Sequence, residues 1–250
     1  MDRRKEFVEL ISITRKFLEQ ERDRGVEELI QHLEEKRAES QALEDLAGSI
    51  KDCQKCKLGR TRTNLVFGAG NPKAELMFVG EGPGFDEDRL GIPFVGKAGQ
   101  LLTKIIESIG LKREKVYISN IVKCHPMRDP SHPEMRGNDR PPAQDEVAQC
   151  LPILFKQIGI IKPKIICTLG SPATKALLNL SGGIGGVRGK FYDFYPPYGK
   201  FGEPIKVIPT YHPAYLLRDP NRKGEVWEDM KKIKKTMTIG GNSCGRKARK

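Results

Sequence analysis

Four of the six cysteines are spaced as the ligands of a metal site would be: Cys53, Cys56, Cys124 and Cys150, separated by 2, 67 and 25 residues. The first two form a C-x2-C pair, and two distant cysteines can complete a shell of four sulfurs. Zinc and 4Fe–4S clusters both accept four thiolates, so the ligand type does not choose between them. A zinc site usually has a second close pair, and a thioredoxin-like redox site needs only the first pair. Two widely separated single cysteines therefore favour an iron–sulfur cluster.

The alternative for any of these cysteines is burial as a small apolar side chain. Cys167 fits that description best, because it lies inside the apolar run Lys164–Leu169. Cys244 lies in a basic tail, and we interpret it as an incidental free thiol.

Four further side chains could take part in recognition or catalysis. Glu81 lies within the turn Gly80–Gly84 and could orient or deprotonate a water, although a purely structural turn is an equal alternative. The amide of Asn120 has a donor and an acceptor, which match the edge of a pyrimidine. Phe94 could stack on a base or belong to the core. His212 could donate a hydrogen bond to an oxygen that gains negative charge, or it could be structural.

These side chains must be positioned by a predicted α/β fold. Apolar runs predict strands at 75–80, 115–120, 164–170 and 205–211, and helical patterns fall at about 97–109, 142–158, 171–180 and 223–236. Their alternation predicts a three-layer α/β/α sandwich with a central four-stranded parallel sheet. The region 181–204, rich in Gly, Pro and aromatic residues, is expected to be a long loop or hairpin. Ligands bind beyond the carboxyl ends of such strands, where Glu81, Asn120 and His212 lie.

Charge and helical periodicity divide the chain into three parts. Residues 1–48 are predicted to form a helical extension, as one helix broken near Gly25 or as two helices. Residues 1–50 hold 9 Lys and Arg against 13 Asp and Glu, whereas the whole chain of 250 residues has a net charge of +12. Residues 49–237 are thus predicted to form a basic domain, which favours a polyanionic partner such as nucleic acid. Residues 238–250 are predicted to be a basic, disordered tail.

Neither a membrane span nor a secretory signal is evident, which predicts a cytoplasmic protein associated with the nucleoid and no membrane partner. In a reducing compartment, metal ligation by the cysteines is favoured over disulfides.

In combination, these residues resemble the family 4 uracil-DNA glycosylases, the iron–sulfur branch of the uracil-DNA glycosylase superfamily. The matching segments, in order from about residue 50 to 235, are CQKC at 53–56, GEGPGFDED at 80–88, GIPFVGKAGQLL at 91–102, NIVKC at 120–124, EVAQCLP at 146–152 and HPAYLLR at 212–218. The resemblance implies a monomer that flips uracil out of single- or double-stranded DNA and hydrolyses its N-glycosidic bond. It also implies a 4Fe–4S cluster on Cys53, Cys56, Cys124 and Cys150.

The resemblance implies roles for the other residues. Phe94 would stack on uracil, Asn120 would pair with its edge, and His212 would stabilise the departing uracil anion. Glu81 would position or activate the water. The pocket would be lined by Glu81 and Gly82, with Glu87.

In the segment HPAYLLR, Leu216 or Leu217 would wedge into the space that the flipped base vacates, and Arg218 would contact phosphate. The interval from Cys124 to Cys150 looks about ten residues longer than the family pattern. We place this insertion at Met127–Arg140, beside the DNA channel. The presence of histidines in this loop resembles a superfamily branch that traps uracil sites covalently. The basic signature loop of that branch is not evident in this sequence.

Two alternatives belong to other functional classes. One is a non-catalytic iron–sulfur protein that binds DNA, against which the joint presence of Glu81, Asn120 and His212 argues. The other is a zinc-stabilised nucleotide-binding domain, which a colourless rather than brown protein would indicate.

Overall fold

The computed structural model describes residues 3–198 and 202–241. Along the chain they divide into two compact units, the first ending at Ala42 and the second beginning at Leu43. The first is the long part of a single helix, α1 (Arg3–Ser49), which runs through Gly25 without the expected break. A single glycine among strong helix formers costs only about 1 kcal/mol, which the surrounding Glu and Arg residues offset. Leu43 is buried in the second unit's core, so that unit begins before the expected boundary after residue 48.

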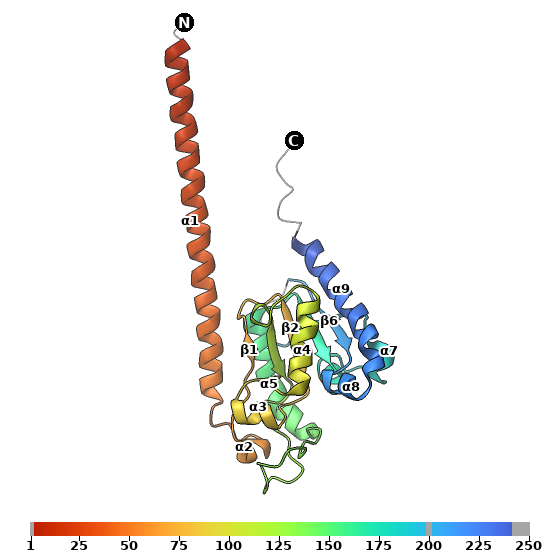
Figure 1. The fold of residues 1–250 in the computed structure, drawn as a ribbon. Helices are drawn as coiled ribbons and strands as arrows, with labels where there is room; N and C mark the ends of the chain where they lie inside the picture. The colour runs from red at the N-terminus through yellow and green to blue at the C-terminus, as the bar shows by residue number, and fades with distance from the viewer. Residues whose placement is uncertain (1–2, 199–201, 242–250) are drawn as a thin grey trace. The chain divides into compact units, whose positions relative to one another are not determined.

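The second unit is built on a six-stranded sheet in the order β1-β3-β2-β4-β6-β5. Figure 1 shows this sheet within the second unit, with β1, β2 and β6 labelled. Its strands are β1 (Ala69–Gly70), β2 (Leu76–Gly80), β3 (Tyr117–Asn120), β4 (Ile165–Leu169), β5 (Tyr192–Phe194) and β6 (Ile205–Thr210). The four predicted strands form the parallel centre, whereas β1 and β5 pair antiparallel at the two edges. The expected four-stranded sheet is thus the centre of a mixed sheet. The region 181–204, expected to be a long loop or hairpin, contains β5, which pairs antiparallel with β6.

Helices cover both faces of this sheet, which confirms the three-layer α/β/α architecture. The helices whose buried residues pack on the two faces are α4 (Lys97–Ser108), α8 (Pro213–Arg218) and α9 (Lys223–Gly241), and α5 (Gln144–Ile161) and α6 (Ser171–Leu178). The unit also contains the short helices α2 (Leu58–Thr61), α3 (Phe85–Leu90) and α7 (Ile184–Val187), and 3-10 turns at Arg113–Lys115 and Pro220–Arg222.

The alternation of side chains along the strands divides the core between the two faces. On β2, Leu76 and Phe78 pack into the cluster that contains buried residues of α4, α8 and α9. The intervening Met77 and Val79 pack into the cluster that contains residues of α5 and α6. All five residues of β2 and of β4 are buried, as expected for parallel strands covered on both faces.

The C-terminal part of the described chain is helical beyond the expected end of the domain, because α9 continues to Gly241. The rest of the expected tail, including Cys244, lies outside the described residues. Cys167 is fully buried in β4, as its apolar surroundings predict. In the described ranges, no helix combines the length and the apolar content that crossing a membrane requires.

Candidate active site and cysteine site

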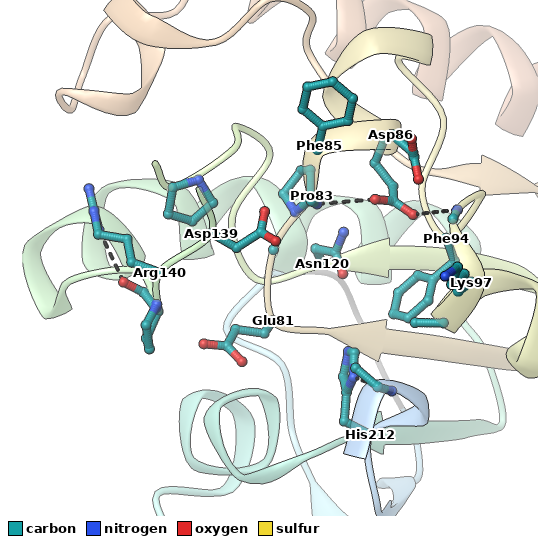
Figure 2. A pocket seen from close by; sticks show the side chains of 18 of the residues that line it. Glu81, Pro83, Phe85, Asp86, Phe94, Lys97, Asn120, Asp139, Arg140 and His212 are labelled. Atoms are coloured by element: carbon teal, nitrogen blue, oxygen red, sulfur yellow. Dashed lines mark hydrogen bonds between the residues drawn. The ribbon is translucent and has the colours of Figure 1, made fainter. Parts of the chain in front are cut away.

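A cleft of about 480 Å³ opens at the carboxyl ends of the central strands (Figure 2). The end of β3 brings Asn120 to it, and the segments that follow β2 and β6 bring Glu81 and His212, as the topology predicts. Six of the residues with an expected base-binding or catalytic role line this one cleft: Glu81, Gly82, Glu87, Phe94, Asn120 and His212. Arg218 lines it as well.

Asn120 is the most deeply placed polar group of the cleft. Its side chain is 1% exposed, and its Oδ1 has no hydrogen-bond partner within the protein. Buried amide oxygens are nearly always paired, so an unpaired one facing a cleft indicates a ligand that donates to it. Gly80 makes room for this amide, because a Cβ there would lie 2.5 Å from Asn120 Oδ1 and 2.5 Å from the Phe94 ring.

Phe94 forms a wall of the cleft in a strained backbone conformation. Its φ of +54° lies in the left-handed region, which costs a non-glycine residue about 1–3 kcal/mol. Its ring is mostly buried and lies 5.6 Å from the His212 ring, centroid to centroid. Gly99 allows the turn, because a Cβ there would lie 1.9 Å from the Phe94 carbonyl oxygen. Strain of this kind is retained where a fixed ring position matters.

His212 is held as a neutral hydrogen-bond donor. It caps α8, and its Nδ1 accepts a hydrogen bond from the backbone N–H of Ala214 at 3.1 Å. With Nδ1 as the acceptor, the ring proton lies on Nε2. Burial, and secondarily the charge of Arg218, lowers the pKa of His212 to about 4. The imidazole is therefore uncharged at neutral pH.

Two carboxylates of the cleft have different environments. Burial raises the pKa of Glu81, which lines the cleft beside His212. Glu87 instead uses both carboxylate oxygens on the backbone: it accepts from Gly84 N–H at 3.2 Å, Val95 N–H at 2.8 Å and Gly96 N–H at 3.0 Å. Glu87 therefore fixes the first turn of α3 against the loop that carries Phe94. Its role in the pocket is to hold the walls in place.

The segment Met127–Arg140 forms an ordered wall of the cleft. Asn138 is buried and closes the loop by donating to the Asp129 carbonyl oxygen at 2.6 Å. Arg136 lies 4.6 Å from the centre of the Phe85 ring and pairs with Asp86 at 2.8 Å. Sequence reasoning missed Arg136 at the cleft, because its contact depends on how the loop closes.

The histidines beside and within this loop have partners in the protein. His125 is buried, and its Nε2 lies 2.6 Å from Asp139 Oδ1. His132 is exposed and lies 3.0 Å from an Asp129 oxygen. Neither is among the residues that line the cleft.

The two leucines for which the sequence predicted a wedge role differ in their burial. Leu216 is 1% exposed and packs in the core, so it cannot serve as a wedge without leaving that core. Leu217, the next residue of α8, is 47% exposed and is accessible to a partner. The sequence could not separate these neighbours, because the choice depends on which face of the short helix the core covers.

The four predicted ligand cysteines come together. Cys53, Cys56, Cys124 and Cys150 line one small cavity, although their separations in the sequence are large. Among the described side chains, no three Cys, His, Asp or Glu groups converge closely enough to bind a single metal ion. Four thiolates around a shared cavity are a ligand set that zinc or a 4Fe–4S cluster accepts, and each iron of such a cluster binds one cysteine.

The surroundings of the cavity also fit a cluster with sulfur ligands. Arg62 Nη1 donates to Cys124 Sγ at 3.2 Å, and the backbone N–H of Lys123 donates to Cys150 Sγ at 3.3 Å. Burial raises the pKa of the Cys124 thiol to about 11 and also raises that of Cys150. Both sulfurs are therefore protonated at neutral pH unless a metal replaces the proton. Asp88, which sequence reasoning missed, ties this region to α3 by accepting from Thr63 N–H at 2.9 Å.

Comparison with known proteins agrees with this site. Residues 67–231 match the model of the uracil DNA glycosylase superfamily. The chain belongs to the uracil-DNA glycosylase superfamily. A type-4 uracil-DNA glycosylase of Sulfurisphaera tokodaii is 47% identical over 199 residues, which cover 77% of this chain and 84% of that protein. The type-4 enzyme of Archaeoglobus fulgidus is 42% identical, covering 83% of this chain and 96% of its own. That of Thermotoga maritima is 43% identical, covering 77% and 93%.

These relatives confirm the resemblance to the family 4 uracil-DNA glycosylases seen in the sequence motifs. The superfamily match spans the parallel centre of the sheet and the strand ends that form the cleft. It begins after the C-x2-C pair, and α1 also lies outside it.

Proposed function

We propose that this protein excises uracil from single- or double-stranded DNA by hydrolysing the N-glycosidic bond and leaving an abasic site. The observation that carries the proposal is the buried, unpaired Oδ1 of Asn120 in a cleft that also contains Phe94 and His212. Uracil flipped into the cleft would donate its N3–H to this oxygen and accept at O4 from the same amide. Cytosine presents the opposite pattern at both positions.

Cleavage would follow from charge stabilisation. As the C1′–N1 bond breaks, its electron pair moves into the uracil ring, and negative charge develops at O2. The neutral Nε2–H of His212 would donate to that oxygen, and the stronger bond to the anion lowers the barrier. The sugar becomes an oxocarbenium-like cation.

Glu81 would complete the reaction from the same cleft. Its carboxylate would orient a water, which adds its oxygen to C1′ and transfers a proton to the carboxylate. The raised pKa of Glu81 makes it a better proton acceptor than an exposed carboxylate.

Leu217 would fill the gap in the base stack, and Arg218 would contact a phosphate. The protein would act as a monomer in the cytoplasm, at the nucleoid.

The test is incubation of the purified protein with uracil-containing oligonucleotides, single-stranded and duplex, followed by alkali cleavage at abasic sites. Matched oligonucleotides with cytosine or thymine are the control. Strand scission only at uracil is the expected result. Intact uracil strands with a folded protein would instead favour a non-catalytic DNA-binding protein.

We further propose that Cys53, Cys56, Cys124 and Cys150 hold a 4Fe–4S cluster, which would connect the loop before α2 to α5 and to the segment that follows β3. Replacement of any of the four by alanine should abolish iron and sulfide binding and lower the melting temperature. Cys167→Ala, a buried cysteine remote from the cavity lining, is the matched control and should retain the iron. Loss of iron in Cys167→Ala but not in Cys150→Ala would contradict this ligand set.

A further inference from the structure

Lys123 is a fully buried lysine between the cysteine site and the uracil-reading side chain. It is 1% exposed, follows Asn120 by three residues and directly precedes Cys124. Lysine is rarely buried to this extent, because its ammonium group must recover the hydrogen bonds that it loses from water. The partners it has recovered therefore indicate what it does.

The ammonium group has three acceptors. Nζ donates to Ser119 Oγ at 2.5 Å, to Gln157 Oε1 at 2.7 Å and to the carbonyl oxygen of Asn120 at 2.8 Å. The last bond acts on the backbone of the residue whose amide faces the cleft. Since Asn120 is the last residue of β3, the bond restrains the end of that strand.

The backbone of Lys123 is bound to the cysteine site. Its N–H donates to Cys150 Sγ at 3.3 Å. Cys150 and Gln157 are seven residues apart on α5, two helical turns, so they lie on the same face of that helix. One face of α5 thus binds Lys123 at two points: Cys150 accepts from its backbone N–H, and Gln157 accepts from its side-chain nitrogen.

We propose that Lys123 is a positioning residue that links the four-cysteine site to Asn120, so that an intact metal site holds the uracil-reading amide in place. This inference rests on the function proposed above. A cysteine site filled by metal fixes Cys150 and, through α5 and Lys123, the end of β3. If the cysteines lose their metal, Cys150 is released, and Asn120 becomes less well ordered in the cleft.

The test uses Lys123→Met, which keeps an unbranched chain of similar length and removes the donors. We expect it to retain iron and sulfide at the wild-type ratio, but to bind free uracil about tenfold more weakly by calorimetry. That factor corresponds to the loss of about one buried hydrogen bond. Single-turnover excision at saturating enzyme should fall at least as much. Wild-type uracil affinity in folded Lys123→Met protein would overturn the inference.

Two further variants guard against a simple folding defect. Gln157→Leu removes one acceptor and leaves the ammonium group in place, so it should weaken uracil binding in the same direction with iron retained. Thr174→Val removes buried hydrogen bonds elsewhere in the core, between the Thr168 and Thr174 hydroxyls at 2.8 Å and from the Thr174 hydroxyl to the Gly170 carbonyl oxygen at 2.8 Å, and should not change uracil affinity. If Lys123→Met does not fold, unchanged uracil binding in folded Gln157→Leu protein overturns the inference.

Iron removal tests the link itself. Chelation should weaken uracil binding in the wild-type protein and have little further effect in Lys123→Met, since coupled sites give non-additive losses. Additive losses would overturn the link. A wild-type protein that neither binds nor excises uracil would refute the proposed function as well, so the two failures are distinguishable.

Discussion

The amide of Asn120 can discriminate between uracil and cytosine because it presents one acceptor and one donor to the base edge. Its Oδ1 is buried without a protein partner, so a base that donates to it compensates its desolvation. Cytosine has an unprotonated N3 at this position and would leave the oxygen unpaired. Discrimination of this type is strong, because the wrong base leaves buried polar groups without partners.

Asn120→Asp is therefore expected to weaken uracil excision and to shift the preference toward cytosine, because a protonated carboxyl can donate where the amide accepts. Single-turnover rates on matched uracil and cytosine oligonucleotides measure the shift. Asn120→Ala is the control, and it should lose uracil excision without gaining cytosine excision. An Asn120→Asp variant with the wild-type ratio of rates would contradict base reading by this residue.

The acid limb of the pH–rate profile should report Glu81 before His212. Glu81 must be ionised to accept a proton, and burial raises its pKa. His212 must only stay neutral, and its pKa is lowered to about 4. As the pH falls, Glu81 is therefore protonated first, and excision is lost before His212 takes up a proton.

Single-turnover rates from pH 4 upward test this order. Glu81→Gln should slow excision while DNA binding survives, and its residual activity should persist down to a lower pH than that of the wild type. If activity is lost at the same acidic pH in Glu81→Gln as in the wild type, a group other than Glu81 causes the acid limb.

At the scale of elements, the short helix α8 shows one face to the core and another to solvent. Leu217→Ala should weaken excision from duplex DNA while the melting temperature stays unchanged, because its exposed side chain makes few core contacts. Leu216→Ala should instead lower the free energy of unfolding by about 2–5 kcal/mol, the usual range for a buried leucine. Thermal melts and excision assays on both variants separate these effects. Equal losses of stability would place both leucines in the core.

The centre of the sheet could be predicted from the sequence because buried parallel strands are continuous apolar runs. The edge strands could not. β1 has two residues and includes Gly70, and β5 has three residues within an aromatic loop, so neither carries a pattern of its own. Their pairing is determined by neighbours that only the folded sheet supplies.

Most of the cleft could be predicted from the sequence, because its residues lie where the predicted strands end. Glu81, Asn120 and His212 lie at or just beyond the carboxyl ends of parallel strands, so topology alone brings them together. Lys123 could not be predicted, because a lysine in a sequence is normally taken as exposed. Its role depends on Gln157, which is 34 residues away in the sequence.

At the scale of the whole molecule, the net positive charge comes from the part of the chain after residue 50. Residues 1–50 carry more acidic than basic side chains, whereas the chain as a whole has a net charge of +12. All the cleft residues and the four cysteines belong to the unit that begins at Leu43. DNA binding is thus expected to depend on the second unit and to be electrostatic in large part.

DNA affinity should accordingly fall steeply with salt, with a slope in a double-logarithmic plot close to the number of phosphates contacted. Deletion of residues 1–42 should preserve this slope and the rate of uracil excision, and light scattering should report a monomer before and after. The deletion ends at Ala42 because Leu43 is 7% exposed and packs with the core, so its removal would create a cavity. If the shortened protein folds and keeps its iron but no longer excises uracil, residues 1–42 take part in DNA binding or catalysis. A folded, active protein with a shallower slope would mean instead that the acidic helix contributes phosphate contacts through its own lysines and arginines.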